Sequence, residues 1–301
     1  MDFRCSLASR LHHEPLGGTA STVRAFLLVE HDGPWGIDAL RDCRLPPEVC
    51  TALRRRSAAT GVRTLLIRRP VRRRRTDQAV QVFAAWAEPG RSWLEGATLP
   101  DVASVLDLDL SALSAGRTTG LPVVEHPVFA VCTHGRHDAC CAERGRPTMQ
   151  ALALSRPVES WEVSHIGGDR FAANLLVLPD GLYYGRVEPE DAEPLAAGHL
   201  AGRLDLDRFR GRSGFPFPAQ AAEIALRRQL DETAVDAVRL LGSSVDGTLV
   251  RVRLEAGGRE YVVDVRVTAR PEAQLTCRSL RARVAQRYDV VGVARRRDVT
   301  P

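Results

Sequence analysis

The sequence contains no lysine, so all 42 of its basic residues are arginine. They exceed the 37 acidic residues and give a formal net charge of +5. We attribute the missing lysine to compositional bias of the genome, and it indicates no mechanism. Part of the excess is local, because six of the eight residues from Arg68 to Arg75 are arginine. Such a block is usually a solvated loop and could also dock an acidic protein partner. Nucleic-acid binding is disfavoured, since neither interleaved aromatic residues nor a reader motif accompanies it.

Long hydrophobic runs and an export signal are also missing. No apolar run approaches the roughly eighteen residues that a membrane-spanning helix needs. The start, from Met1 to Cys5, lacks the basic and apolar regions of a secretory signal. With 44% hydrophobic and 26% charged residues, the composition is that of a globular protein. We therefore expect a soluble, cytoplasmic protein with no membrane partner.

The cysteines do not form the pattern of a disulfide framework. There are seven, an odd number, and a reducing cytoplasm disfavours disulfides. Clustered cysteines in such a compartment bind metal or carry out redox chemistry, whereas isolated ones behave as small core hydrophobes. We expect the second behaviour of Cys43, Cys50 and Cys277. The clustered cysteines are Cys132, Cys140 and Cys141.

The order of predicted elements is repeated in the first two thirds of the chain. Each copy reads as strand, helix, strand and then a hairpin, which is the order of a thioredoxin-like fold with two parallel strands joined by a crossover helix. The first copy is predicted at 26–29, 46–59, 63–67, 80–86 and near Trp93, with a short closing helix at 100–105. The second is predicted at 128–131, 147–154, 158–163, 175–178 and 182–185, followed by a helix at 190–204.

The sequence thus predicts an α/β (α+β) protein of three domains. Residues 1–118 form a degenerate thioredoxin-like domain without metal ligands, and residues 119–206 form the thioredoxin-like domain that carries the chemistry. Residues 207–301 form a small α+β unit with no visible chemistry. In that unit we expect a turn-rich linker at 211–218, a helix at 219–230 and a hairpin of 248–254 with 260–268.

Four ligand-capable side chains arrive in two pairs from two predicted loops. Cys132 leaves the end of a strand, and Cys141 follows after eight intervening residues, just before the expected helix. His165 and Asp169 lie in a second loop, where Gly167 and Gly168 let the backbone approach a bulky centre. Backbone amides of such loops stabilise the negative charge of bound thiolates. The pattern predicts a four-ligand metal site, but spacing alone leaves iron and zinc open.

The string VCTHGRHDACC at 131–141, followed by SHIGGDRFAANLLVLPDGLYYG at 164–185, strongly resembles the sucrase/ferredoxin-like family. The stretch CSLASRLHHEPLGGTASTVRAFLLVEH at 5–31 also resembles its bacterial members, so the resemblance covers roughly residues 3–190. This family's thioredoxin-like domain is known for a C-x8-C pair and an H-x-G-G-H pair around a [2Fe-2S] cluster. The resemblance therefore implies a ferredoxin fold and an iron-sulfur cofactor.

Transferred by position, the resemblance makes Cys132 and Cys141 the thiolate ligands of one iron and His165 a ligand of the other. The fourth position departs from the family pattern, because Asp169 stands where the second histidine is expected. The fourth ligand is therefore Asp169, the neighbouring Cys140, or a group that the sequence does not reveal. A carboxylate would restore negative charge and lower the reduction potential relative to a Rieske-type centre.

The first functional hypothesis is one-electron transfer between a separate reductase and an acceptor protein, which makes the chain an electron carrier rather than a stand-alone enzyme. No nucleotide-binding loop is present, so the reductase must be another chain. The second hypothesis is a zinc-stapled interaction module with the same ligands. The third hypothesis is thiol redox chemistry by Cys140 and Cys141. It is weakened because these two cysteines do not form a C-x-x-C motif, the usual form of such a dithiol. Sucrose hydrolysis would need two positioned carboxylates, which no stretch indicates.

Overall fold

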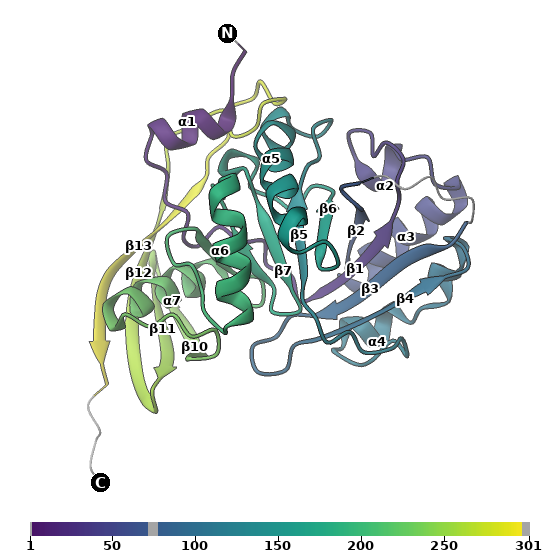
Figure 1. Ribbon diagram of the computed structural model, residues 1–301. Helices are drawn as coiled ribbons and strands as arrows, with labels where there is room; N and C mark the ends of the chain where they lie inside the picture. Colours follow the sequence, from purple (N-terminus) through teal and green to yellow (C-terminus); the bar gives the residue numbers. More distant parts are fainter. Residues whose placement is uncertain (1, 72–77, 297–301) are drawn as a thin grey trace.

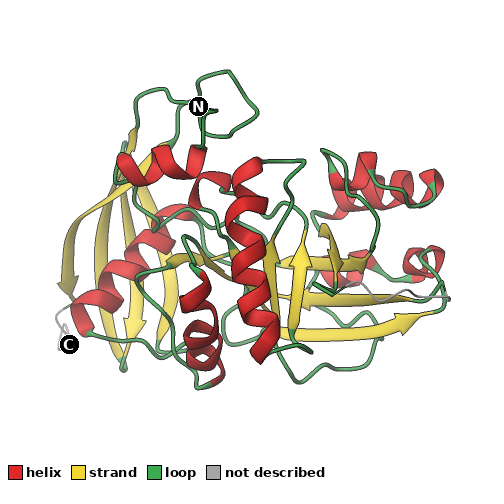
Figure 2. Cartoon of the chain, turned by 45° about the horizontal axis from the view of Figure 1, so that its top comes forward, coloured by secondary structure: helices red, strands yellow, loops and turns green. Residues whose placement is uncertain are grey.

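The computed structural model describes residues 2–71 and 78–296. Within these ranges it contains a nine-stranded sheet, in the order β4-β3-β1-β2-β6-β5-β7-β8-β9, and a separate four-stranded sheet, in the order β10-β11-β12-β13 (Figure 1). Helices and strands are mixed along the chain, which confirms the mixed α/β class. Figure 2 shows the four-stranded sheet as a group of its own beside the large one.

The first half of the large sheet follows the predicted order. β1 (Ala25–Glu30) is parallel to β2 (Arg63–Arg68), and α3 (Pro47–Thr60) lies between them in the chain. β3 (Val80–Trp86) pairs antiparallel with β1 and with β4 (Trp93–Leu99). The expected closing helix is a 3-10 turn, η1 (Ala103–Asp107), followed by α4 (Leu110–Ser114); a short α2 (Ala39–Asp42) precedes α3.

The second half repeats this connectivity. β5 (Val128–Cys132) is parallel to β6 (Ser160–Val163), and β7 (Leu175–Leu178) pairs antiparallel with β5 and with β8 (Leu182–Tyr184). α6 (Pro189–Leu200) follows and ends four residues before the predicted end. The two halves join where β2 and β6 pair antiparallel over Ile67 to Val163 and Arg68 to Glu162. The strand order is therefore nearly symmetric about this seam.

One helix begins much earlier than the sequence suggested. α5 spans Ala139–Ser155, whereas a start at Pro147 was predicted, because proline favours the first turn of a helix. Instead Pro147 lies inside the helix, and Asp138 is the N-cap, its side chain accepting a hydrogen bond from the Cys140 N–H at 2.9 Å. Cys140 and Cys141 consequently lie on the first helical turn rather than in a loop before it.

The large sheet is curled around a core that both halves share. Phe83 of β3 and Trp161 of β6 belong to strands three places apart, which would lie about 14 Å apart in a flat sheet. Their rings instead contact edge to face with centroids 5.5 Å apart. The hairpin ends also meet, since Ser92 Oγ donates to Asp180 Oδ1 at 2.8 Å. Helices α3 and α4 cover the opposite sheet face in the first half, and α5 and α6 cover it in the second.

The C-terminal region begins differently from the expectation. The predicted linker at 211–218 was wrong in its first part, because β9 (Phe209–Arg212) pairs with β8 and extends the large sheet. This strand is buried although half of it is arginine, since Arg210 donates to Asn174 and Arg212 pairs with Glu223 at 2.9 Å. α7 (Phe217–Leu230) and the predicted hairpin of β11 (Leu249–Ala256) with β12 (Arg259–Ala269) are present.

Two further strands flank that hairpin and were not predicted: β10 (Val238–Asp246) and β13 (Gln286–Arg295). Packed against one face of the four-stranded sheet, α7 shares with it a separate hydrophobic core. A long connection between β12 and β13 returns across the molecule to α1 (Cys5–Leu11) and to the start of α5 (Figure 1). The three-domain division at residues 118 and 206 stays a prediction.

No helix within residues 2–71 or 78–296 is long and apolar enough to cross a bilayer. Of the arginine block from Arg68 to Arg75, positions 72–75 lie outside the described residues. Arg68 forms an ion pair with Glu162 at 2.6 Å, and Arg69 stacks over the Trp161 ring. The described start of this block is therefore bound to β6 and its surroundings rather than free in solvent.

Candidate metal centre

The predicted ligands converge at one edge of the large sheet. Cys132 ends β5, Cys141 lies on the first turn of α5, His165 follows β6, and Asp169 begins a 3-10 turn, η2 (Asp169–Phe171). Because β5 and β6 are parallel, their carboxyl ends and the following loops lie at the same edge. The two sulfur atoms and a ring nitrogen of His165 all lie within 4.8 Å of one another. The arrangement is one in which a metal ion or small cluster can be held.

Small residues allow this convergence. A Cβ at Gly145, on α5, would lie 2.1 Å from the Cys132 carbonyl oxygen, so only glycine lets the helix approach the end of β5 this closely. Gly167 and Gly168 have φ of 97° and 80°, which other residues rarely adopt. A Cβ at Gly168 would also lie 2.2 Å from Arg210 Nη2. The glycine pair thus makes the turn and accommodates a buried arginine, which the sequence did not reveal.

Asp169 links the imidazole to one thiol. Its Oδ1 lies 2.8 Å from His165 Nδ1 and accepts from the Cys141 thiol at 3.1 Å, and the carboxylate is only 4% exposed. Burial opposes ionisation, but the close positive charge of His165 lowers the pKa of Asp169. Burial alone would lower the pKa of His165, but Asp169 and Cys132 raise it to about 9. The charged forms of these two groups therefore stabilise each other.

The two thiols differ in their ease of ionisation. The neighbouring Cys141 thiol, opposed by burial and assisted by His165, holds the pKa of Cys132 well below its usual value. The neighbouring Cys132 sulfur, together with burial and the charge of Asp169, raises the pKa of Cys141. Cys132 is thus prepared as the thiolate that metals bind. Metal binding must therefore release the Cys141 proton and one proton of the His165 imidazolium.

One buried atom has an incomplete environment that a metal would complete. His165 Nδ1 is buried and has no well-aligned hydrogen bond, although Asp169 lies close to it. Buried polar atoms without partners are rare in native proteins and are explained by an ion, a cofactor or a catalytic role. Two thiols, an imidazole and a carboxylate suit iron-sulfur clusters and zinc alike. The residues present therefore fit the implied cofactor.

The first half of the molecule forms one wall of this centre. His134 Nε2 lies 2.9 Å from the Gly36 carbonyl oxygen, and its Nδ1 accepts from the His165 backbone N–H at 3.2 Å. His137 stacks on His165 with ring centroids 3.7 Å apart, and its Nδ1 lies 3.1 Å from the Ile37 carbonyl oxygen. The histidines in the Cys132 to Cys141 loop therefore pack against the loop after β1 and position His165 from behind.

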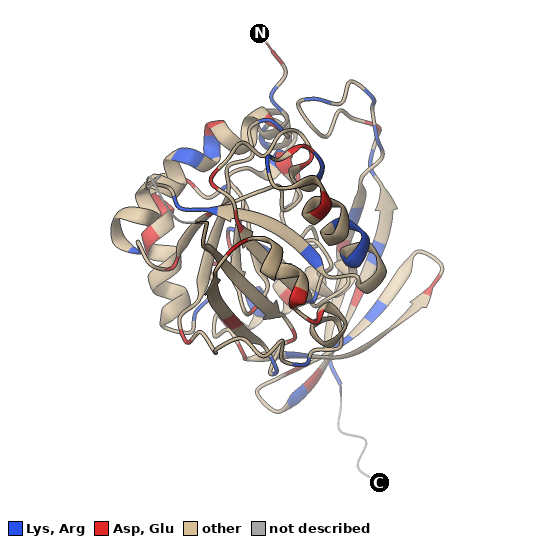
Figure 3. Cartoon of the chain, turned by 90° about the vertical axis from the view of Figure 1, so that its right-hand side faces the viewer, with Lys and Arg blue, Asp and Glu red and all other residues tan. Residues whose placement is uncertain are grey.

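The open side of the centre faces a cavity of about 520 Å³. His137, His165 and Asp169 line one side, and residues of the connection between β12 and β13 line the other. Four arginines contribute to its lining: Arg170, Arg278, Arg281 and Arg283. Figure 3 shows that elsewhere along the chain arginines and acidic residues are interspersed. Arg170 is paired with Glu14 at 2.8 Å, and the other three arginines belong to the connection between β12 and β13.

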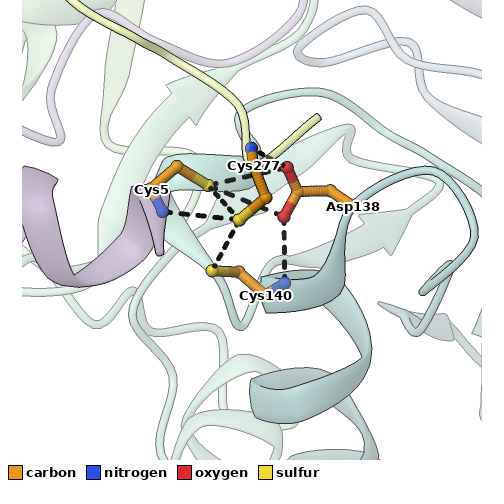
Figure 4. A group of neighbouring side chains, drawn as sticks. All are labelled: Cys5, Asp138, Cys140 and Cys277. Carbon is orange, nitrogen blue, oxygen red and sulfur yellow. Dashed lines mark hydrogen bonds between the residues drawn. The ribbon is translucent and has the colours of Figure 1, made fainter. Parts of the chain in front are cut away.

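Cys140, the alternative fourth ligand, lies in another group. Its sulfur contacts Ser6 Oγ at 3.2 Å and Cys277 Sγ at 3.4 Å, together with Cys5 and Asp138 (Figure 4). Cys277 was expected to be an isolated core cysteine; it packs partly buried against a small hydrophobic cluster, but it is not isolated, because Cys5 and Cys140 lie beside it. Because α5 separates neighbouring side chains by about 100° around its axis, Cys140 and Cys141 point to different groups. That separation removes support for a dithiol made of these two neighbours.

One family and two known proteins match parts of this chain. The sucrase/ferredoxin-like family matches residues 16–211. Altered inheritance of mitochondria protein 32 of Meyerozyma guilliermondii is 30% identical over 92 residues, which are 27% of this chain and 33% of that protein. The chain thus spans about a third of the length of this curated relative. A thioredoxin-like [2Fe-2S] ferredoxin from Aquifex aeolicus is 20% identical, covering 31% of this chain and 97% of that one, with a TM-score of 0.27.

The family match extends over more than half of the sequence. It begins before β1 and ends within β9, so it includes nearly the whole of the large sheet. It also includes Cys132, Cys141, His165 and Asp169, the four residues that meet at the sheet edge. From this match we conclude that the chain belongs to the sucrase/ferredoxin-like family.

Proposed function

We propose that this protein carries electrons on a [2Fe-2S] cluster bound by Cys132, Cys141 and His165, with Asp169 as the fourth ligand. The observation that carries the proposal is the convergence of two thiols and an imidazole, their ligand atoms within 4.8 Å of one another, at one sheet edge. The buried Nδ1 of His165 without an aligned hydrogen bond supports it. Membership of the sucrase/ferredoxin-like family supports it as well.

The chain prepares this edge for negative charge. Cys132 is readily ionised, and Cys141 lies on the first turn of α5, where the helix N-terminus stabilises thiolates. When bound, the cluster supplies one-electron redox chemistry. Asp169 would add a negative charge that a second histidine would not, so the potential is expected to lie below that of a bis-histidine centre. The protein residues themselves hold, orient and shield the centre.

The same edge suits contact with a redox partner. His165 retains 27% of its side-chain exposure, whereas both cysteines are buried, so electrons have their shortest route through the imidazole. The arginine-lined cavity beside it favours a partner with an acidic surface, because complementary charge accelerates encounter and fixes orientation. We propose that a separate reductase or acceptor docks here, in the cytoplasm, and that the protein is a carrier rather than a stand-alone enzyme.

A zinc-stapled interaction module is the second candidate. The compactness of the site favours it, since ligand atoms around a single tetrahedral zinc lie about 3.3–3.8 Å apart. In that case the ligands would hold the two loops together and transfer no electrons. Zinc has no redox chemistry and no visible absorption, so the two candidates differ in colour.

The test is the visible absorption and reduced-state paramagnetic resonance of protein purified without oxygen, together with its iron, sulfide and zinc content. About two irons and two sulfides per chain with red-brown absorption would support the ferredoxin proposal. A colourless protein with zinc in place of iron would overturn it. If the protein contains the iron-sulfur cluster, Asp169→Ala should lower the cluster content and Cys140→Ala should leave it unchanged. The opposite result would make Cys140 the fourth ligand.

A further inference from the structure

A second group of ligand-type side chains lies beside the proposed cluster site. It consists of Cys5 at the start of α1, Asp138 and Cys140 at the start of α5, and Cys277 in the connection between β12 and β13 (Figure 4). Cys5, Asp138 and Cys140 are buried, and Cys277 is partly buried. Cys5 and Cys277 both lie outside the region that the sucrase/ferredoxin-like family matches. The group is thus not explained by the cluster site.

The sulfur atoms have the spacing of ligands around one metal ion. Cys277 Sγ lies 3.5 Å from Cys5 Sγ and 3.4 Å from Cys140 Sγ. With metal–sulfur bonds of about 2.3 Å, tetrahedral geometry places neighbouring sulfurs about 3.8 Å apart. All four ligand atoms, including a carboxylate oxygen of Asp138, lie within 4.8 Å of one another. The three cysteines are free thiols, so no disulfide accounts for their proximity.

Asp138 is the fourth member and is fully buried. One oxygen accepts from the Cys140 N–H at 2.9 Å, the other from the Cys277 N–H at 2.6 Å, and both lie 3.6 Å from Cys5 Sγ. Among the described residues no ion pair involving Asp138 is found. Buried carboxylates are normally paired with a cation or bound to a metal. A divalent ion among the three sulfurs would supply the missing positive charge.

The surroundings also suit thiolates. Ser6 Oγ donates to Cys140 Sγ at 3.2 Å, and the Cys5 backbone N–H donates to Cys277 Sγ at 3.4 Å. Hydrogen bonds of this kind stabilise the charged form of a sulfur. Cys140 also lies on the first turn of the 17-residue helix α5, where the helix dipole favours negative charge. Three different parts of the chain have therefore been brought together around a site for a cation.

We propose that Cys5, Cys140, Cys277 and Asp138 bind a structural zinc ion at a site separate from the proposed cluster site. Three thiolates and a carboxylate form a closed tetrahedral set with no position left for a substrate, which is typical of structural zinc sites. Binding releases the thiol protons to solvent. The ion joins α1 and the connection between β12 and β13 to the first turn of α5. The first turn of α5 thus contributes one ligand to each site, Cys140 to the zinc site and Cys141 to the proposed cluster site.

The test is the metal content of the full-length protein, purified in the presence of zinc and a reducing agent, in three double variants. Cys5→Ala/Cys277→Ala should lose about one zinc per chain and keep its iron and sulfide. Cys132→Ser/Cys141→Ser should keep that zinc. Cys43→Ala/Cys50→Ala is the matched control, because these two sulfurs also lie 3.3 Å apart but join none of the ligand groups found in the described residues. This control variant should leave the zinc, iron and sulfide content unchanged.

The proposal would be overturned by wild-type protein without this zinc, by zinc that is unaffected in Cys5→Ala/Cys277→Ala, or by loss of iron in that variant, which would place the cluster here instead. A disulfide among the three cysteines in the reduced preparation would also overturn it. If Cys5→Ala/Cys277→Ala does not fold, zinc-edge X-ray absorption of the Cys132→Ser/Cys141→Ser variant decides the matter. It should show three sulfurs at about 2.3 Å and one oxygen at about 2.0 Å; imidazole or four sulfurs would contradict the assignment.

Discussion

The two halves of the large sheet share their connectivity but not their chemistry. In each half a strand is followed by a crossover helix, a parallel strand and an antiparallel hairpin. In the second half, the proposed ligands occupy the strand end, the first helical turn and the loop after the parallel strand. In the first half, α3 begins 17 residues after β1 ends, carries a proline at its start and places Cys50 in the hydrophobic core. The topology creates converging loops, and only the residues on them decide whether metal binds.

The half without ligands still contributes to the site. The loop after β1 supplies the Gly36 and Ile37 carbonyl oxygens that contact His134 and His137, and Trp35 packs edge to face on His134. The first half has therefore become a wall of the centre that its counterpart contains. A duplicated fold can use one copy for chemistry and the other to orient and shield that chemistry.

The largest expected effect is loss of the bound cofactor when one of the proposed sulfur ligands is removed. Cys132→Ser should lower the iron content by about tenfold or more, because a hydroxyl is a far weaker ligand for iron than a thiolate. Cys50→Ser, at a buried cysteine of the first half, should leave iron content unchanged. Iron and sulfide analysis of both variants makes the comparison. Equal loss in the two would mean that destabilisation, not ligation, is being measured.

The shared core provides the next test. Trp161→Ala and Phe83→Ala should each lower the free energy of unfolding by about 3–5 kcal/mol, because each leaves a large cavity. The double variant should lose less free energy of unfolding than the sum of the two single losses. The difference should be about 0.5–1.5 kcal/mol, the usual contribution of a contacting aromatic pair. Denaturant unfolding of the single and double variants measures this coupling. Leu53→Ala, inside the first half, should show no such coupling with Trp161→Ala. Strictly additive losses for the Phe83 and Trp161 pair would argue against a common core.

The close approach of α5 to β5 depends on a glycine of the helix, whereas α3 of the first half contains no glycine. Gly145→Ala should cost about 1–3 kcal/mol of stability, because the added methyl would overlap the Cys132 carbonyl group. Gly198→Ala on α6 is the control, since its nearest neighbour is 3.8 Å away. It should be neutral or stabilising by up to about 1 kcal/mol. Thermal unfolding of both variants distinguishes backbone contact from general helix effects.

The smallest expected change is electronic. Asp169→His restores the second histidine of the family pattern and should keep the iron content while raising the reduction potential, because the centre loses a negative charge. Voltammetry of the two proteins under identical conditions checks the sign. The same potential in both would show that residue 169 does not bind the metal. Asp169→Asn, which removes charge but keeps shape, should raise the potential too if any cluster remains bound.

Much of this architecture was predictable because its signals are local. The buried run at Phe26 to Val29 and the turn at Pro179 to Gly181 predicted β1 and the β7–β8 hairpin within a residue or two. The start of α5 was missed because Pro147 outweighed the better signal, the capping carboxylate of Asp138. β9 was missed because two arginines and a glycine do not resemble a buried strand, and the partners of the arginines are remote in sequence.

The candidate centre was predictable for the same reason, since its ligands come from two short segments with recognisable spacing. Nothing comparable marked Cys277, which meets Cys5 across 272 residues of sequence. Spacing rules apply only to ligands within one or two neighbouring loops, so a contact of this range becomes visible only in the folded chain. The role of His134 was hidden likewise, because its partner Gly36 belongs to the other half.

The meeting of Cys5 with Cys277 has a consequence for the order of events during synthesis. Cys141 and Asp169 are 28 residues apart, so the proposed cluster site can assemble while the ribosome is still making α7. The second group remains incomplete until Cys277, which follows Asp169 much later in the chain, has emerged. Contacts between distant segments form late because closing long loops is entropically costly. We therefore expect the segment that carries Cys277 to close over α5 after the residues of the proposed cluster site have come together.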